Sequence, residues 1–244
     1  MRIPRLHVPH PLAPGIHVEL PRQQGDHLTR VLRLGNNDKL TLFNGDGREY
    51  AGEIVGKSRD GLSVRVDAQL PERSVESALQ ITLAQSIARG EKMDWILQKA
   101  TELGVAAIIP IVTGRTEVRL DRERAARRIA HWQAVIVSAC EQSGRLRVPE
   151  LAMPQNLGDW LAGLDDSGSL CLALDPDGEL TTRSLPRFER ASIVVGPEGG
   201  LSDADLAALR SRGFQGLRLG PRILRTETAG ISALAALQAV HGDS

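Results

Sequence analysis

Two segments near the C-terminus decide the fold, IVVGPEGGLSDADL (residues 193–206) and GFQGLRLGPRILRTETAG (residues 213–230). Each contains a short apolar strand, a turn with glycine and proline, and the start of a helix. In the first segment Ser202 is a favourable N-cap for the helix that follows. In the second, a strand at Leu217–Leu219 precedes an Ala- and Leu-rich helix over Glu227–Val240. Repeated strand–turn–helix units indicate an α/β domain with a mainly parallel sheet.

The same alternation of strands and helices extends back toward residue 79. Apolar runs of four to seven residues predict buried strands, and apolar residues at helical spacing predict helices. The expected strands are Leu79–Ala84, Ala106–Val112, Ser169–Leu174 and Ser192–Val195, and the expected helices are Glu91–Leu103 and a long helix from the N-cap Asp121 to about Gln142.

Residues 1–72 have a different pattern, with short alternating strands and turn signals. The expected strands are Arg2–Val8, Ile16–Leu20, Lys39–Phe43, Glu49–Val55 and Leu62–Val66. A short amphipathic helix is expected at Gln24–Leu34, and Arg59-Asp60-Gly61 is a hairpin signal. Many short strands around one helix favour a small β-barrel. The polar segment Leu70–Ser77 is a plausible linker, so we expect domains at 1–72 and 73–244.

Composition excludes several classes of protein. Among 244 residues, 41% are hydrophobic and the formal net charge is zero, which argues against a disordered chain. The N-terminal stretch lacks the continuous apolar core of a signal peptide, and no run is long enough to cross a bilayer, so we expect a cytoplasmic protein with no membrane partner. Two cysteines cannot supply a disulfide framework or a four-ligand zinc site, and we expect no metal.

The distribution of charge is more informative than its sum. Residues 1–72 carry a net charge of +1, residues 73–150 carry +3 and residues 151–244 carry −4. Only four of the thirty basic residues are lysine. Arginine suits phosphate and base recognition, although an arginine-rich codon usage explains the same bias. A neutral total excludes a protein that coats nucleic acid by bulk charge.

The loops of the two opening segments are the candidate ligand-binding loops. Ligands of α/β sheets bind beyond the carboxyl ends of strands, and glycines let the backbone approach them closely. The loop at 196–202 is neither a P-loop nor a dinucleotide fingerprint, and an ordinary connector remains the alternative. In the loop at 219–229, Thr226 or Thr228 could cap the helix. Arginines at a helix N-terminus oppose its dipole, so capping alone explains Arg222 and Arg225 poorly.

These segments, in this order, resemble the SPOUT (α/β-knot) methyltransferases. Further stretches resemble the bacterial 16S ribosomal RNA (uracil-N3)-methyltransferases within that superfamily. They are EKMDWILQKATELGVAAIIPIVTGRTEVR (91–119), HWQAVIVSACEQSGRLRVPEL (131–151), HLTRVLRLGNNDKL (27–40) and NGDGREYAGEI (44–54). The resemblance covers nearly the whole chain. One departure is Gly35-Asn36-Asn37-Asp38, where this family more often has Gly-Asp.

The resemblance implies a PUA-like N-terminal β-barrel that binds RNA, a C-terminal domain with a trefoil knot, and a homodimer. It implies that S-adenosylmethionine is held bent in the knot, mostly by backbone groups of three loops. We expect the cofactor-binding residues to be Leu172, Leu174, Gly196, Pro197, Glu198, Gly199, Gly200, Leu219, Gly220, Ile223, Leu224, Thr226, Thr228 and Ala229. The Asp175-Pro176 turn receives no role.

The chemistry of the implied reaction suggests the catalytic residues. Methylation of uracil N3 requires loss of a proton, and the resulting charge spreads onto the neighbouring carbonyl oxygens. An arginine can stabilise that charge, and Arg225 is the candidate ahead of Arg222. A carboxylate can take the proton, and Glu227 and Glu198 are both possible. Methylation at carbon would need a cysteine nucleophile, but Cys140 and Cys171 lie in apolar surroundings.

We therefore expect methylation of uridine N3 in 16S rRNA of the small ribosomal subunit. The alternatives are a SPOUT ribose 2′-O-methyltransferase on tRNA or rRNA, and a non-catalytic ribosome-assembly protein. The basic patch at Arg122, Arg124, Arg127 and Arg128 is either a solvated helix face or a phosphate contact. The RNA-binding candidates are Arg30, Arg33, Arg115, Arg145 and Arg222.

Overall fold

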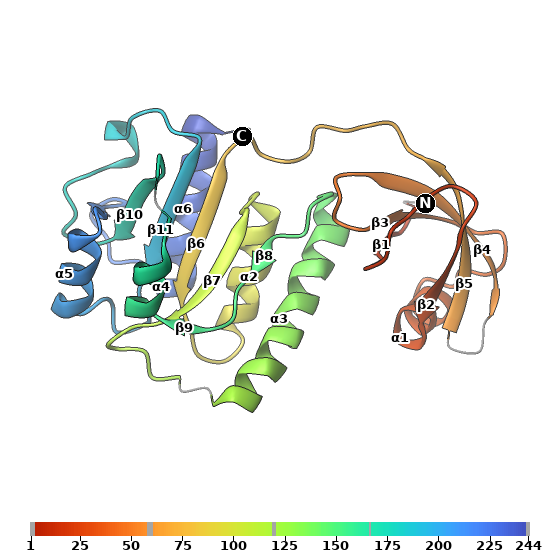
Figure 1. Cartoon of the computed structure of the whole chain (residues 1–244), viewed down its shortest axis with the longest axis horizontal. Helices are drawn as coiled ribbons and strands as arrows, with labels where there is room; N and C mark the ends of the chain where they lie inside the picture. The colour runs from red at the N-terminus through yellow and green to blue at the C-terminus, as the bar shows by residue number, and fades with distance from the viewer. Residues whose placement is uncertain (1–2, 58–60, 119–120, 166, 243–244) are drawn as a thin grey trace. The chain divides into compact units, whose positions relative to one another are not determined.

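The computed structural model of this chain describes residues 3–57, 61–118, 121–165 and 167–242 (Figure 1). The chain forms two compact units. Unit 1 comprises Met1–Glu76 together with Cys140–Val148, and unit 2 comprises Ser77–Ala139 together with Pro149–Ser244. The sequence predicts residues 140–148 in the second domain, but in the structure they belong to unit 1.

Unit 1 is built around a five-stranded mixed sheet in the order β1-β3-β4-β5-β2. Strand β1 runs parallel to β3, and the other neighbours are antiparallel. The elements of unit 1 are β1 (Arg5–His7), β2 (His17–Pro21), α1 (Arg22–Asp26), the π-helix η1 (His27–Val31), β3 (Lys39–Phe43), β4 (Glu49–Lys57) and β5 (Gly61–Gln69).

The sheet of unit 1 curls because β4 carries two register shifts, at Ala51/Gly52 and at Ile54/Gly56. Bulges of this kind bend a strand and increase its twist. The curled sheet encloses one apolar core made of alternate strand residues, and Leu28 of η1 completes it. The predicted small β domain is therefore confirmed in its strands. The hairpin signal at residues 59–61 falls mostly outside the described residues.

The structure does not contain the single amphipathic α-helix expected at Gln24–Leu34. A short α-helix, α1, leads directly into the π-turn η1, and Leu34 lies beyond both. Arg33 adopts a left-handed conformation with φ of 59°, which ends the helical run. The apolar periodicity identified the segment as helical but could not reveal the wider turn.

Unit 2 contains a parallel sheet in the order β12-β10-β11-β6-β7-β8, and β9 also pairs with β7. Its elements are β6 (Gln80–Ser86), α2 (Lys92–Glu102), β7 (Ala107–Val112), α3 (Arg122–Ser143, whose last residues lie in unit 1), β8 (Glu150–Leu151), β9 (Gln155–Asn156), α4 (Leu157–Gly163), β10 (Leu170–Leu174), the 3-10 helix η2 (Thr182–Ser184), β11 (Arg190–Val195), α5 (Asp203–Ser211), β12 (Gln215–Leu217) and α6 (Thr226–His241).

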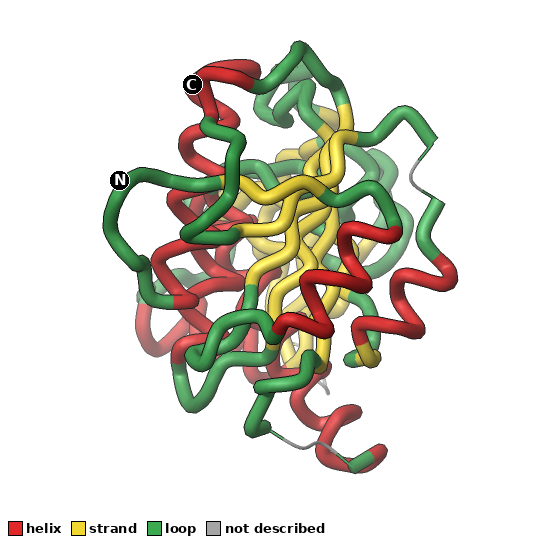
Figure 2. Tube along the Cα trace, turned by 90° about the vertical axis from the view of Figure 1, so that its left-hand side faces the viewer, coloured by secondary structure: helices red, strands yellow, loops and turns green. Residues whose placement is uncertain are grey.

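Helices cover both faces of this sheet (Figure 2). Val194 packs with Leu161 of α4 and Leu209 of α5 in one core cluster. The next residue, Val195, points to the opposite face and comes within 3.4 Å of the Cβ position of Gly230 on α6. Helix α2 packs against α6 on that second face. The α/β fold with a parallel sheet, expected from the sequence, is confirmed.

Three local expectations for unit 2 differ from the structure. The strand expected at Leu217–Leu219 is β12 at Gln215–Leu217, so Leu219 belongs to the following loop. Helix α6 begins at Thr226, one residue before the expected Glu227. Four short elements were not predicted from the sequence: α4, η2, β8 and β9. Among the described residues, no helix is long and apolar enough to cross a membrane.

Candidate active site

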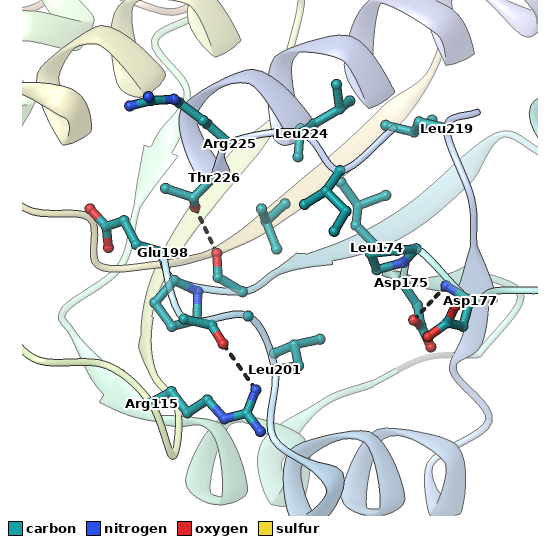
Figure 3. A pocket seen from close by; sticks show the side chains of 18 of the residues that line it. Arg115, Leu174, Asp175, Asp177, Glu198, Leu201, Leu219, Leu224, Arg225 and Thr226 are labelled. Carbon is teal, nitrogen blue, oxygen red and sulfur yellow. Dashed lines mark hydrogen bonds between the residues drawn. The ribbon is translucent and has the colours of Figure 1, made fainter. Parts of the chain in front are cut away.

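A pocket of about 630 Å³ lies at the carboxyl ends of three adjacent parallel strands, β10, β11 and β12 (Figure 3). This volume is within the ~300–1,000 Å³ range of small-molecule sites. The loops that follow the strands supply most of the lining. The lining residues are Lys92, Arg115, Leu174, Asp175, Pro176, Asp177, Val195, Gly196, Pro197, Glu198, Gly199, Gly200, Leu201, Asp203, Leu206, Leu217, Leu219, Gly220, Arg222, Ile223, Leu224, Arg225, Thr226 and Ala229.

The glycine loop at 196–200 is closely packed and needs its glycines. A Cβ on Gly196 would lie 2.8 Å from the backbone nitrogen of Leu201, and Gly200 has a left-handed φ of 70°. The N–H of Gly200 donates to the carbonyl of Pro197 at 2.9 Å and closes a turn. Arg115 secures the loop from outside, because its Nη1 donates to the carbonyl of Gly199 at 3.0 Å.

The start of helix α5 fixes the far end of this loop. Ser202 accepts a hydrogen bond from the N–H of Asp205, and the Asp205 carboxylate accepts one from the N–H of Ser202, so the pair forms a capping box. The N-cap predicted from the sequence is therefore confirmed. Asp205 also accepts bonds of 3.1 and 3.2 Å from the N–H of Gly114, which ties the β7–α3 loop to the site.

The start of α6 does not use the caps considered in the sequence analysis. The N-cap position is Arg225, and no side chain caps this helix. The Thr226 hydroxyl instead donates to the carbonyl of Gly196 at 2.6 Å (Figure 3). It also accepts a bond of 3.0 Å from Nε2 of Gln85. Thr228 is exposed on the first turn. The capping interpretation is wrong for Thr226, whose hydroxyl joins two of the pocket loops.

The loop at 219–225 offers backbone donors to the pocket. Within the described part of the chain, the N–H groups of Leu219, Ile223 and Leu224 have no hydrogen-bond partner. All three residues line the pocket, and Leu174, the last residue of β10, lines it from the neighbouring strand. A flat heterocycle fits such a lining, because apolar side chains cover its faces and backbone groups bind its polar edge.

The two ends of the pocket differ in chemistry. In Figure 3, Arg225 and Glu198 lie at one end, and Leu219, Asp175 and Asp177 lie at the other. The Arg225 side chain is exposed and has no ion-pair partner among the described residues. A planar cation that is free at the rim can bind an anionic or polarised group of a second substrate.

Lys92 lies between two carboxylates at the charged end. Glu198 lines the pocket together with Lys92, whereas Glu227 is next to Lys92 and is not among the lining residues. The Lys92 ammonium lies 3.2 Å from Glu198 and 3.5 Å from Glu227. Burial raises the pKa of the Glu198 carboxyl, but backbone N–H groups, including that of Arg89, and the Lys92 ammonium outweigh this effect. The pKa of Glu198 therefore lies below its ordinary value, which makes Glu198 a weaker base.

Sequence reasoning missed several lining residues. Lys92 is one of only four lysines in the sequence, and its position in the first turn of an amphipathic helix gives no signal for a site. Asp175 was given no role, although it follows strand β10 directly and its carboxylate accepts a bond of 3.0 Å from the N–H of Asp177. The signal that could have identified Asp175 was its place at a strand carboxyl end, next to the two glycine loops.

Most of the expected cofactor-binding residues line this pocket, and two do not. Leu172 is fully buried in the middle of β10, below the loops, and Thr228 faces away from the pocket lining. Of the expected RNA-binding arginines, Arg115 and Arg222 line the pocket. In unit 1, Arg30 is exposed and lies 3.5 Å from Asp26.

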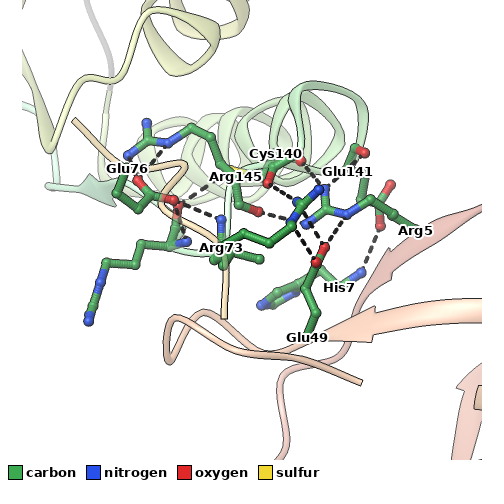
Figure 4. Close-up of polar contacts among 11 residues, drawn as sticks. Arg5, His7, Glu49, Arg73, Glu76, Cys140, Glu141 and Arg145 are labelled. Atoms are coloured by element: carbon green, nitrogen blue, oxygen red, sulfur yellow. Dashed lines mark hydrogen bonds and ion pairs between the residues drawn. The ribbon is translucent and has the colours of Figure 1, made fainter. Parts of the chain in front are cut away.

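The structure places Arg145 in a buried network of unit 1 (Figure 4). Its side chain is 8% exposed, and its Nη2 lies 2.7 Å from Glu76. Glu76 also accepts bonds from the N–H groups of Leu146 and Arg147, and Arg5 donates to the carbonyl of Arg145. Arg145 thus holds segment 140–148 within unit 1, and its guanidinium is not presented on the surface.

Comparisons with known proteins agree with this geometry. The RNA methyltransferase domain family matches residues 75–238, and the RNA methyltransferase PUA domain matches residues 20–67. Ribosomal RNA small subunit methyltransferase E of Bacillus subtilis is 33% identical over 86% of this chain and 85% of its own length. The protein of that name from Rickettsia conorii is 32% identical over 96% of this chain and 95% of its own length.

Two solved structures are similar along their whole length. A methyltransferase of Legionella pneumophila, solved with its bound cofactor SAM, has a TM-score of 0.94 and 40% identity and covers 100% of both chains. Ribosomal RNA small subunit methyltransferase E of Neisseria gonorrhoeae, bound to S-adenosylmethionine, has a TM-score of 0.91 and 36% identity and covers 99% of both chains. This chain therefore belongs to the ribosomal RNA small subunit methyltransferase E family of RNA methyltransferases.

Proposed function

We propose that this protein uses S-adenosylmethionine to methylate N3 of a specific uridine in 16S rRNA of the small ribosomal subunit. The names of its relatives support the cofactor and the ribosomal RNA substrate. The N3 position rests on the resemblance of the sequence and on the charged residues at one end of the pocket. The observation that carries the proposal is that Arg225 and Lys92 line that end, with Glu227 3.5 Å from the Lys92 ammonium. The loop beside them has backbone N–H groups that are unpaired among the described residues.

The pocket fits S-adenosylmethionine. The apolar residues Leu174, Leu219 and Leu224 line the end that would hold the adenine, and the free N–H groups of the same loop can bind its ring edge. The carboxylate of Asp177 is an acceptor for ribose hydroxyls. Gly196 leaves no room for a side chain, so the backbone itself forms the wall of the site. When bound, the cofactor supplies an electrophilic methyl group on a sulfonium centre.

The chain's own residues would then activate the acceptor nitrogen. The new bond joins the methyl carbon to N3 as the carbon–sulfur bond breaks, and the N3 proton must go to a base. Arg225 can stabilise the charge that spreads onto the two carbonyl oxygens flanking N3. The rim position of Arg225 suits this role, because a uracil that enters the pocket from solvent would meet Arg225 there.

Glu227 is the better candidate for the base. Glu198 is held by the N–H of Arg89 and by Lys92, and its lowered pKa weakens it as a proton acceptor. Glu227 is the second residue of α6, and one of its carboxylate oxygens is buried without a hydrogen-bond donor among the described residues. An acceptor that no protein donor satisfies is available for a substrate proton.

RNA binding would use unit 1 together with the rim of the pocket. We propose Arg30 and Arg33 as contacts in unit 1 and Arg115 and Arg222 as contacts at the pocket. Arg145 has no part in this proposal, because it is buried against Glu76. A homodimer and a cytoplasmic location are further parts of the proposal.

The proposal is tested by incubating the protein with S-adenosylmethionine and small ribosomal subunits from a strain that lacks this gene. The 16S rRNA is then digested and its nucleosides are identified by mass spectrometry. We expect N3-methyluridine with the wild-type protein and none with Arg225→Ala. A 2′-O-methylated nucleoside would favour the ribose methyltransferase. Cofactor binding without any methyl transfer to RNA would favour a non-catalytic assembly protein.

A further inference from the structure

Lys92 connects three separate elements at the charged end of the pocket. It is the first residue of α2, and its Nζ donates to Oε1 of Glu198 at 3.2 Å. The same Nζ lies 3.5 Å from Oε2 of Glu227 at the start of α6. The three side chains are between 19% and 34% exposed, so solvent screens these charges only in part.

The position of Lys92 is unfavourable for its own helix. The N-terminus of a helix carries a partial positive charge, and a cation there is destabilising. The ordinary acidic residue of the first turn is also present, at Asp94. Local helix preference therefore does not account for a lysine at this site, whereas the two carboxylates opposite it do.

The two carboxylates depend on Lys92 to different degrees. Glu198 has a second donor, the N–H of Arg89, at 3.2 Å. Glu227 Oε2 is buried and has no hydrogen-bond donor among the described residues, so the Lys92 ammonium is its close cation. Removing the charge of Lys92 would leave Glu198 anchored and Glu227 uncompensated.

Three arginines near this end of the pocket do not pair with Glu227. Arg89 is ion-paired with Glu117 on the β7–α3 loop. Arg115 donates to the carbonyl of Gly199, and Arg225 stands at the rim of the pocket at the head of α6. Among the described residues none of these guanidinium groups lies within ion-pair distance of Glu227.

We propose that Lys92 is a positioning residue that holds the Glu227 carboxylate in place beside the charged end of the pocket, with Glu198 fixing the lysine. This inference rests on the proposed function, because Glu227 acts as the base there. It gives α2 an indirect part in the reaction, because Lys92 acts through Glu227 and not on the methyl group or the uracil.

The expected effect follows from the geometry. Loss of the Lys92 ammonium removes the cation that lies 3.5 Å from the buried Oε2 of Glu227. Methyl transfer should therefore slow, while the cofactor loops at 196–200 and 219–225 stay in place and S-adenosylmethionine still binds.

The test measures the single-turnover rate of methylation of small ribosomal subunits together with the affinity for S-adenosylmethionine. The variants are Lys92→Met, which keeps the length without the charge, and Lys92→Arg, which keeps the charge. We expect Lys92→Met to be about tenfold slower than wild type, with nearly unchanged affinity for the cofactor. Lys92→Arg should restore most of the wild-type rate.

Lys99→Met is the matched control. Lys99 lies on the same helix, is paired with Glu102 at 2.8 Å and is not part of the pocket, so the rate of Lys99→Met should match the wild type. Lys92→Met is also combined with Glu227→Gln. If Lys92 acts through Glu227, it has no further effect on the rate in that background. This comparison stays valid even if each variant loses some stability.

The outcomes are distinguishable. If wild-type protein transfers no methyl group to the subunits, the proposed function fails. If wild type is active and Lys92→Met transfers the methyl group at the wild-type rate, the inference about Lys92 is overturned. An equal slowing by Lys92→Met in the Glu227→Gln background also overturns it, because a lysine that does not act through Glu227 would behave in this way.

Discussion

The hydroxyl of Thr226 donates a 2.6 Å hydrogen bond to the carbonyl of Gly196, thirty residues earlier in the chain. The same hydroxyl accepts a bond from Nε2 of Gln85, in the strand beside β11. One buried oxygen thus joins the glycine loop, the start of α6 and the centre of the sheet. The shape of the proposed cofactor site depends on this junction.

Replacement of Thr226 by Val should weaken S-adenosylmethionine binding about tenfold. The change removes a buried donor and leaves the Gly196 carbonyl without its partner, at a cost of ~1–3 kcal/mol. Isothermal titration calorimetry measures the affinity. Thr226→Ser keeps the hydroxyl and should bind nearly as well as wild type, and Thr228→Val is the exposed control on the same turn. Unchanged affinity in Thr226→Val would show that the junction does not shape the site.

Replacement of Gly196 by Ala should abolish measurable cofactor binding and lower the melting temperature. The new Cβ would lie 2.8 Å from the Leu201 nitrogen and 3.0 Å from the Gly200 carbonyl carbon, so the loop must open. Gly163→Ala is the matched control, because a Cβ there meets nothing within 4 Å. Thermal unfolding with and without S-adenosylmethionine reports both effects. A Gly196→Ala protein that the cofactor stabilises normally would contradict the prediction.

Replacement of Arg225 by Ala should slow methyl transfer by roughly 10²- to 10³-fold, the effect of removing one donor from a developing anion. The exposed side chain makes no ion pair among the described residues, so folding should be little affected. Arg225→Lys retains the charge but not the planar fork, and should recover only part of the rate. Single-turnover rates and cofactor affinity are measured together. Loss of affinity with an unchanged rate would move Arg225 from the reaction to cofactor binding.

Both cysteines should resist alkylation in the native protein. Cys140 is fully buried, and burial raises the pKa of its thiol to about 11, so almost no thiolate forms near neutral pH. Cys171 is 7% exposed. Mass spectrometry after treatment with iodoacetamide should find no adducts in buffer and two in urea. Rapid modification of Cys140 in folded protein at neutral pH would reopen the question of a cysteine nucleophile.

Local sequence signals predicted much of the secondary structure because local chemistry determines it. The alternation of Leu40 and Leu42 matches strand β3 with the same bounds, and the Ser202 cap matches the start of α5. Short elements such as α4 and β12 were missed or displaced, since their few apolar residues give almost no periodicity. The segment at 24–34 contains a π-turn that the usual helical spacing does not reveal.

The sequence by itself determined the class of fold, the two glycine loops and the presence of an arginine and a glutamate at the start of the last helix. Only the tertiary structure decided which side chains meet. Parallel strands bring loops from distant parts of the chain to one sheet edge, so Lys92 reaches Glu198 and Glu227 from 106 and 135 positions away. Packing also explains why Arg145, which we expected on an RNA-binding surface, is buried and paired with Glu76. Spacing along the chain carries no record of such contacts, because they follow from how the helices and strands pack.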